Sequence, residues 1–138
     1  NDALRKRISG KVLKAYDAIG EKYYACSLAE DDNWKNRKSK KNFASWAIPY
    51  YEKAENTSRL STMRSIVKEL DEKIREDDMK FGQALTDFPE TSSFCKILIK
   101  AGYKTLGDVL KASITDIDNI EGMGPKKMTS VKAFRDKF

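Results

Sequence analysis

The sequence predicts an all-α protein, in which an N-terminal bundle of long helices is followed by a compact domain of short helices. Apolar residues recur every three or four positions along residues 3–30 and along residues 58–78, which is the spacing that lines one face of a helix. After residue 89 the pattern changes to short apolar groups separated by capping residues and glycines. We therefore expect a helical bundle at 1–80, a linker at 81–89 and a compact domain at 90–138.

The first long helix is expected at residues 3–30, and the second begins after the turn signal at residues 56–58. Each carries one apolar stripe, and two such helices are expected to pack as an antiparallel bundle. The predicted inward face of the first helix is Leu4, Ile8, Val12, Tyr16, Ile19, Tyr23 and Cys26. That of the second is Leu60, Met63, Ile66, Val67, Leu70 and Ile74. Because the two cysteines both lie on apolar helical patterns, Cys26 and Cys95 are predicted to be buried free thiols.

A basic segment separates the two long helices. Residues 34–41 contain five cations and no acid, and their lack of periodicity predicts a loop. Aromatic residues follow at helical spacing, with Pro49 as a kink or a helix start. Cations interleaved with aromatics can bind nucleic acid by phosphate contact and base stacking. The alternative is a solvated loop beside a helix whose aromatics are core. The five cations are Lys35, Arg37, Lys38, Lys40 and Lys41.

The C-terminal part contains clear stop and start signals for short helices. A helix over residues 94–101 is expected to end at Gly102, since glycine readily takes the positive φ of a helix C-terminus. Thr105 and Ser113 are expected to be N-caps of the next two helices. The last helix, after residue 124, should face inward with Met128, Val131 and Phe134.

The turn before this last helix is the strongest functional signal in the chain. Gly122 and Gly124 can take positive φ and let a ligand approach the backbone closely. Pro125 suits the first position of a helix, where its missing N–H would have no partner in any case. The free N–H groups of that helix start, with Lys126 and Lys127 beside them, predict an anion site, for which a nucleic acid phosphate is the obvious ligand.

Residues 113–135 resemble a helix-hairpin-helix motif. The resemblance rests on Ile117, Ile120, the Gly-Met-Gly turn, the Pro-Lys-Lys step and Val131. It implies that Gly122, Met123 and Gly124 donate backbone N–H groups to a phosphate, flanked by Lys126 and Lys127. Residues 88–92 occupy the place of a first hairpin in a tandem arrangement. They lack glycine and carry Glu90, so any such hairpin is expected to pack and not to bind.

The longer stretch from about residue 85 to 138 resembles the C-terminal domain of the bacterial RNA polymerase α subunit. The similar residues are Leu98, the Ala-Gly-Tyr step at 101–103, residues 105–110 and the glycine turn with its lysines. The resemblance implies binding to DNA. That family has an arginine that enters the minor groove, whereas this chain has Ser93 at the corresponding position. The departure leaves phosphate contact as the expected mode.

Charge and composition limit the function further. The net charge is +6, and residues 1–88 and 89–138 each have three more cations than acids, so the excess is spread evenly. The chain contains no histidine, which removes the commonest general base and metal ligand, and it has no cysteine cluster for zinc. We therefore predict a protein that is not an enzyme and uses no cofactor or metal.

No apolar run approaches the roughly 20 residues that span a membrane, so we expect no membrane contact. No signal-peptide pattern opens the chain, so we expect an intracellular location, either cytoplasmic or nucleoid-associated. The start at Asn1, without a methionine, indicates a fragment of a longer protein.

Two functional hypotheses follow. The first is a non-catalytic module that binds nucleic acid, DNA in preference to RNA, through backbone phosphates without strong sequence preference. The second is a protein-interaction or dimerisation module of a nucleic-acid-processing or transcription assembly, in which the N-terminal helices hold a partner or a second copy.

Overall fold

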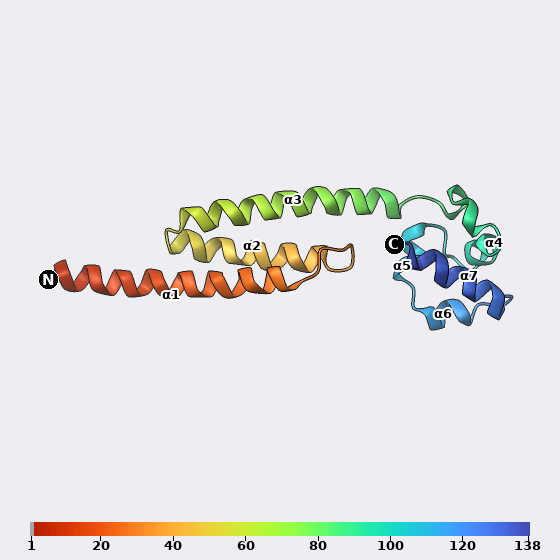
Figure 1. The fold of residues 1–138 in the computed structure, drawn as a ribbon, viewed down its shortest axis with the longest axis horizontal. Helices are drawn as coiled ribbons and strands as arrows, with labels where there is room; N and C mark the ends of the chain where they lie inside the picture. Colours follow the sequence, from red (N-terminus) through yellow and green to blue (C-terminus); the bar gives the residue numbers. More distant parts are fainter. Residues whose placement is uncertain (1) are drawn as a thin grey trace. The chain divides into compact units, whose positions relative to one another are not determined.

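The computed structural model describes residues 2–138, and in this range the fold is all-α, as predicted. It contains seven α-helices, two short 3-10 helices and no strand (Figure 1). No helix within residues 2–138 has the length and apolar character needed to cross a bilayer. The chain separates into two compact units, Asn1–Arg75 and Glu76–Phe138, which we call unit 1 and unit 2.

The division between the units differs from the prediction. It falls inside helix α3, Thr57–Phe81, and not at residue 80. The expected linker at 81–89 is packed: it contains η1 (Leu85–Asp87) and the start of η2 (Pro89–Thr91), and the Leu85 side chain is fully buried. The glycine and proline that suggested a linker are turn residues around a core leucine.

This division also redistributes the charge. Unit 1 contains 17 Lys and Arg against 11 Asp and Glu, whereas unit 2 contains 10 of each. The entire excess of +6 therefore belongs to unit 1, and unit 2 is neutral. The even spread that the sequence suggested arose because the acidic residues 76–78 were counted with the N-terminal part.

Unit 1 contains three long helices: α1 (Asp2–Ala29), α2 (Arg37–Lys53) and the part of α3 up to Arg75. Helix α2 runs antiparallel to both α1 and α3, so these two helices run parallel to each other (Figure 1). The predicted antiparallel pairing of the two longest helices is wrong, because a third helix lies between them in the chain. Pro49 lies inside α2, and the helix begins at Arg37, within the segment predicted to be a loop.

The core of unit 1 is centred on α2. Ala44, Ala47 and Tyr51 of α2 and Met63 of α3 are fully buried, and partly buried tyrosines of α1 pack against them. The buried residues of α1 itself are Gly20 and Ser27. Small side chains on both helices let α1 and α2 approach closely.

The predicted inward face of α1 is therefore wrong for most of its length. Leu4, Ile8, Val12 and Ile19 are 52%, 54%, 46% and 37% exposed. Cys26 is also exposed, contrary to prediction, whereas Cys95 is buried, and both thiols are free as expected. Residues 2–9 of α1 are exposed on all sides, because this end of the helix extends beyond the α2–α3 turn (Figure 1). In the part of α1 that does pack, the buried residues are the small Gly20 and Ser27.

Polar contacts join α1 to the other helices of unit 1. Glu21 Oε1 accepts hydrogen bonds from the Tyr51 hydroxyl at 2.7 Å and from Arg59 Nε at 2.9 Å. Asp17 Oδ1 accepts one from Asn56 Nδ2 at 2.7 Å. These bonds fix α1 beside the α2–α3 turn.

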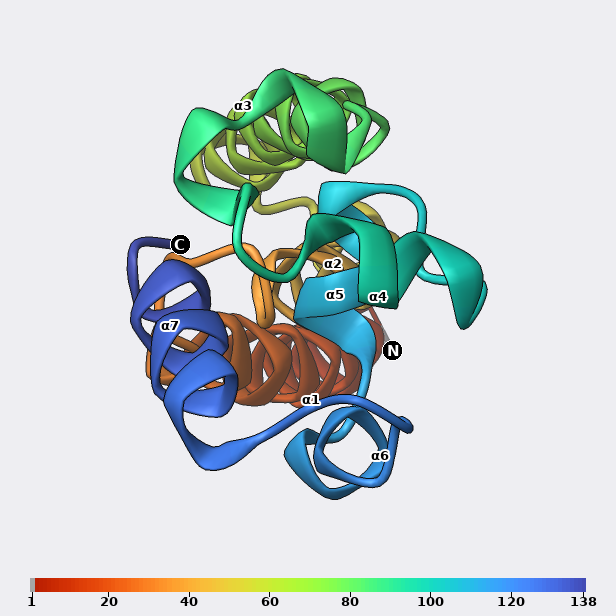
Figure 2. The same cartoon turned by 90° about the vertical axis from the view of Figure 1, so that its right-hand side faces the viewer.

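Unit 2 contains α4 (Cys95–Lys100), α5 (Leu106–Lys111), α6 (Ile114–Asp118) and α7 (Pro125–Asp136), which are seen in Figure 2. The predicted capping signals are confirmed: Thr105 forms a capping box with Asp108, Ser113 caps α6, and Gly102 has a φ of +101°. Fully or almost fully buried residues of its core are Leu85, Phe94, Leu98, Leu106, Val109, Ile117, Val131 and Phe134.

Candidate nucleic-acid interface

Residues 119–124 connect α6 to α7 (Figure 2), and backbone hydrogen bonds within this turn hold it. The Ile120 N–H donates to Ile117 O at 3.1 Å, and the Met123 N–H donates to Ile120 O at 3.0 Å. Gly122 has a φ of +90°, a conformation that side chains with a Cβ rarely adopt. Gly124 is the N-cap residue of α7, and Pro125 occupies the first turn of this helix, as predicted.

Two details of the predicted anion site are corrected. Gly124 has a φ of −82°, so it does not need positive φ. Met123 is a poor donor, because its N–H is bonded to Ile120 O and its side chain is only 8% exposed. The methionine anchors the turn in the core of unit 2 and so holds the two glycines at the surface.

The remaining N–H groups lie at the start of α7. The first intrahelical bond is donated by Met128 to Gly124 O at 3.0 Å, so the N–H groups of Lys126 and Lys127 come too early in the helix to have an acceptor within it. A Cβ on Gly124 would meet no atom within 4 Å. The backbone at the start of α7 is thus open to a ligand.

The lysines of this turn are available. Lys126 is exposed and Lys127 half-buried, and neither forms an ion pair with any described residue of the chain. A hollow of about 510 Å³ adjoins Gly122 and is lined by Lys100 of α4, Glu121, Gly122 and three apolar residues, Ile97, Ala101 and Ile120. Lys100 is a third cation at this turn. No signal in the sequence identified it, because it lies more than 20 positions before the glycines and only the packing of α4 brings it here.

One acid opposes these cations. Glu121 is exposed, precedes Gly122 directly and lines the same hollow as Lys100. A carboxylate at this place repels a phosphate, and its effect is larger because unit 2 has no net charge. The turn therefore offers backbone donors and three cations, with one opposing charge.

Three of the five cations in the predicted basic segment form hydrogen bonds or ion pairs within unit 1. Lys40 Nζ donates to Ser27 O at 2.9 Å and to Glu30 O at 3.1 Å, so it caps the end of α1. Lys41 pairs with Asp71 at 2.5 Å. Arg37 pairs with Asp32 at 3.3 Å.

The predicted loop is helical from Arg37 onward, so Lys40 and Lys41 face α1 and α3, and Arg37 faces the α1–α2 loop. Lys35 and Lys38 remain exposed, and Lys35 Nζ lies 5.6 Å from the Trp34 ring centroid.

The aromatic residues that follow the basic segment are mainly packing residues. Tyr23 of α1 stacks with Tyr50 at 5.7 Å and meets Trp46 edge-on at 6.0 Å between ring centroids. Phe43 meets Trp46 edge-on at 5.4 Å. Tyr23, Phe43 and Tyr50 are half-buried, whereas the Trp46 side chain is 51% exposed. Of the two interpretations of these aromatics, packing between α1 and α2 is the one that the contacts favour.

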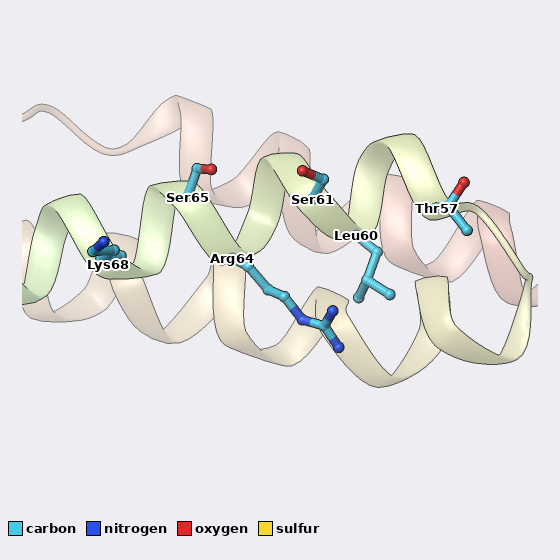
Figure 3. A pocket seen from close by; sticks show the side chains of 6 residues that line it. All are labelled: Thr57, Leu60, Ser61, Arg64, Ser65 and Lys68. Atoms are coloured by element: carbon cyan, nitrogen blue, oxygen red, sulfur yellow. The ribbon is translucent and has the colours of Figure 1, made fainter.

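A second hollow lies along α3 and is open and shallow. Figure 3 shows the side chains that line it, three hydroxyls, one leucine and two cations, which are Thr57, Leu60, Ser61, Arg64, Ser65 and Lys68. Arg64 is paired with Glu52 at 3.4 Å, so its charge is balanced. The hollow offers hydroxyl and cationic side-chain donors along α3, whereas the start of α7 adds free backbone N–H groups to its lysines.

The segment proposed as a degenerate hairpin is packed, as expected. Thr91 is fully buried, and its hydroxyl shares its proton between two carbonyl acceptors, Phe88 O at 2.7 Å and Leu85 O at 2.9 Å. Glu90 pairs with Lys137 at 3.1 Å, and this hydrogen bond lowers the pKa of its carboxyl. Among residues 2–138, no three His, Cys, Asp or Glu side chains gather in a group suited to a metal ion.

The chain matches no protein-family model, no curated protein sequence and no solved structure.

Proposed function

We propose that the chain is a non-catalytic nucleic-acid-binding module that contacts backbone phosphates of DNA without strong sequence preference. The observation that carries the proposal is the start of α7, where free N–H groups meet Lys126 and Lys127 at an open surface. The resemblance of residues 113–135 to helix-hairpin-helix motifs points to the same ligand.

The proposed contact follows from the chemistry of this turn. A phosphate oxygen at the start of α7 accepts hydrogen bonds from the N–H groups of Gly124 and the first turn, where the helix dipole favours negative charge. Lys126, Lys127 and Lys100 then act as point charges around it. Such groups contact the sugar-phosphate backbone and carry no sequence information, so the binding is expected to depend on salt and hardly on sequence.

A second, weaker contact is assigned to Lys35 and Lys38 of unit 1. Both side chains are exposed, and unit 1 carries the whole excess of positive charge. Arg37, Lys40 and Lys41 are left out of this contact, since moving them onto DNA would break bonds within the bundle.

The test is a titration of a fluorescently labelled 20-base-pair duplex, followed by anisotropy at several salt concentrations. Lys126→Glu together with Lys127→Glu is expected to weaken binding severalfold and to lower the salt slope by about 2. The control is Lys104→Glu with Lys111→Glu, which changes the charge of unit 2 equally at two exposed positions around α5. Unchanged affinity of the hairpin variant at low salt would refute the assignment, as would an equal loss in the control.

A second variant is chosen to raise the affinity for DNA, because unfolding of the protein cannot cause a gain of affinity. Glu121→Gln removes the acid beside Gly122 and is expected to raise the affinity for duplex DNA about two- to threefold, the scale of one screened charge. The same titration with single-stranded DNA and with RNA of equal length identifies the preferred nucleic acid.

A further inference from the structure

Helix α1 has an apolar face that packs on nothing in unit 1. Leu4, Ile8, Val12 and Ile19 are between 37% and 54% exposed, and Ala15 between them is exposed as well. We call these five residues the α1 apolar stripe. A row of large aliphatic side chains along one exposed helix face indicates a surface that a partner covers.

The stripe is separate from the face that packs within the bundle. Gly20 and Ser27 mark the packed face, and the stripe lies about a third of a turn away from it around the helix axis. Unit 1 thus already has its close α1–α2 contact. Covering the stripe requires no rearrangement of this contact.

The stripe also has a regular period. Leu4 and Ala15 are eleven positions apart, as are Ile8 and Ile19, and the repeat continues from Val12 to Tyr23. An eleven-residue repeat corresponds to about 3.67 residues per turn, so its members stay on one face of a nearly straight helix. The period suits a long helix lying alongside α1. Trp46, which is half exposed and packs edge-on against Tyr23, extends the apolar surface at its far end.

The charges beside the stripe specify the partner. Residues 2–14 contain the single acid Asp2 and five exposed cations, which are Arg5, Lys6, Arg7, Lys11 and Lys14. Around the helix axis Arg5, Arg7 and Lys11 lie nearest to the stripe, whereas Lys6 lies on the opposite side of α1. None of these cations forms an ion pair with a residue of the described chain. The acids further along α1, Asp17 and Glu21, are already bonded to Asn56, Tyr51 and Arg59.

We propose that the α1 apolar stripe binds an acidic amphipathic helix of another protein, whose apolar seam covers the stripe and whose acids pair with the cations beside it. Parallel pairing of α1 with α1 of a second copy would place cations against cations. Antiparallel pairing about the centre of the stripe would place the cations at residues 5–7 opposite residues 16–18, whose one acid, Asp17, is already bonded to Asn56. Charge complementarity therefore favours a different, acidic chain. A membrane surface is disfavoured, because interfacial helices bury a broad apolar face of Trp, Phe or Leu, whereas this stripe is narrow and has about one aliphatic residue per turn.

The experiment uses the full chain and two synthetic helical peptides of about 25 residues, long enough to follow the stripe at 1.5 Å per residue. Both peptides have Leu and Ile in the eleven-residue repeat. One has Glu at the flanking positions and the other has Lys. Binding is measured by anisotropy of a fluorescein label on the peptide. The acidic peptide is expected to bind in the micromolar range, and the basic peptide is expected not to bind.

Protein variants then separate the apolar and the charged contributions. Ile8→Gln with Val12→Gln is expected to weaken binding of the acidic peptide roughly tenfold or more, since two apolar contacts are lost. Arg7→Glu with Lys11→Glu is expected to weaken it severalfold, with a clear dependence on salt. Matched controls are Met79→Gln, the most exposed large apolar residue, and Lys68→Glu on α3, and both are expected to bind the peptide normally.

Four outcomes would overturn the proposal. They are no binding of the acidic peptide below about 100 μM, equal binding of both peptides, and equal binding by the Ile8→Gln/Val12→Gln variant. The fourth is that another ligand covers the stripe. Light scattering would then show a dimer of the chain that the Ile8→Gln/Val12→Gln substitutions dissociate. Alternatively, these substitutions would abolish binding to phosphatidylglycerol vesicles or duplex DNA, and the acidic peptide would not compete for that binding. The hairpin variants at Lys126 and Lys127 leave this measurement unchanged, so the two proposals fail independently.

Discussion

Gly20 of α1 and the ring of Tyr51 of α2 are in such close contact that a Cβ atom on Gly20 would lie 2.8 Å from Cε1 of the ring. Tyr51 is fully buried, and its hydroxyl donates a hydrogen bond to Glu21, which directly follows Gly20 in α1. Burial and this bond both raise the pKa of the phenol. The ring is held at both ends, so Gly20 sets how closely α1 and α2 approach.

Gly20→Ala is therefore expected to destabilise unit 1 by about 1–2 kcal/mol. Overpacking costs about 1–3 kcal/mol, and the better helix propensity of alanine offsets up to about 1 kcal/mol of this. Urea unfolding followed by tryptophan fluorescence measures it, because Trp34 and Trp46 both lie in unit 1. Gly10→Ala is the control: its Cβ meets no atom within 4 Å, so it should stabilise the unit. Equal effects of the two substitutions would contradict this account of the α1–α2 contact.

Lys40 and Lys38 have the same charge but different roles. Lys40→Met removes two hydrogen bonds to carbonyl groups at the end of α1 and the favourable interaction with the helix dipole, and should destabilise unit 1 by about 1–2 kcal/mol. Lys38→Met should leave the stability unchanged within about 0.5 kcal/mol. The same fluorescence-monitored unfolding compares them. A stability loss at Lys38 as large as that at Lys40 would show that the capping role is misassigned.

The sequence predicted the elements of unit 2 well, because their limits are local. Thr105, Ser113 and Pro125 act through bonds or backbone angles within one helical turn, and such signals are visible in the residues themselves. The positive φ of Gly102 was predicted for the same reason. The conformation of Gly124 was not, because a glycine pattern does not distinguish a residue that needs positive φ from one that only leaves space.

The packing of unit 1 was predicted less well. Periodicity identified α1, but it marked the aliphatic stripe as the inward face, although Gly20 and Ser27 are the buried residues. A small-residue contact has no apolar signal, since its stability comes from close approach of the backbones. The basic segment was misread for a related reason. The partners of Lys40 and Lys41 lie 10 or more positions away in the chain and become visible only when the helices are packed.

Asp108 makes the stability of α5 depend on pH. Its carboxylate accepts hydrogen bonds from the N–H groups of Lys104 at 2.9 Å and Thr105 at 3.1 Å, and these bonds lower its pKa. A carboxyl whose pKa is lowered in the folded state stabilises that state above its unfolded pKa of 3.8 and loses this contribution as the pH falls through the folded value.

Asp108→Asn should therefore reduce the protection of the α5 amides from hydrogen exchange at neutral pH, by about 0.5–1 kcal/mol. At acidic pH, once the native carboxyl is protonated, the difference between the two proteins should shrink. Exchange is measured at both pH values and corrected for the intrinsic rate. A difference that is constant across this range would show that the charge of Asp108 does not contribute.

The two glycines of the α6–α7 turn should respond differently to alanine. Gly122→Ala forces a Cβ into a backbone with a φ of +90°, and it is expected to destabilise unit 2 by about 1–2 kcal/mol. The loss appears as faster hydrogen exchange of the α7 amides. Normal exchange in this variant would mean that the turn relaxes to another conformation without strain.

Gly124→Ala is expected to separate folding from binding. Its φ of −82° is ordinary for alanine and its Cβ meets no atom within 4 Å, so no strain is expected. The α7 amides should lose only the protection, up to about 1 kcal/mol, that alanine costs relative to glycine at an N-cap. The added methyl group would nevertheless stand at the start of α7, where the proposed phosphate approaches the free N–H groups. Duplex DNA should therefore bind severalfold more weakly in the anisotropy titration, although the variant remains folded. If the variant binds DNA as tightly as the native chain, the phosphate does not lie on this helix start, and the glycine turn connects α6 to α7 without contacting the nucleic acid.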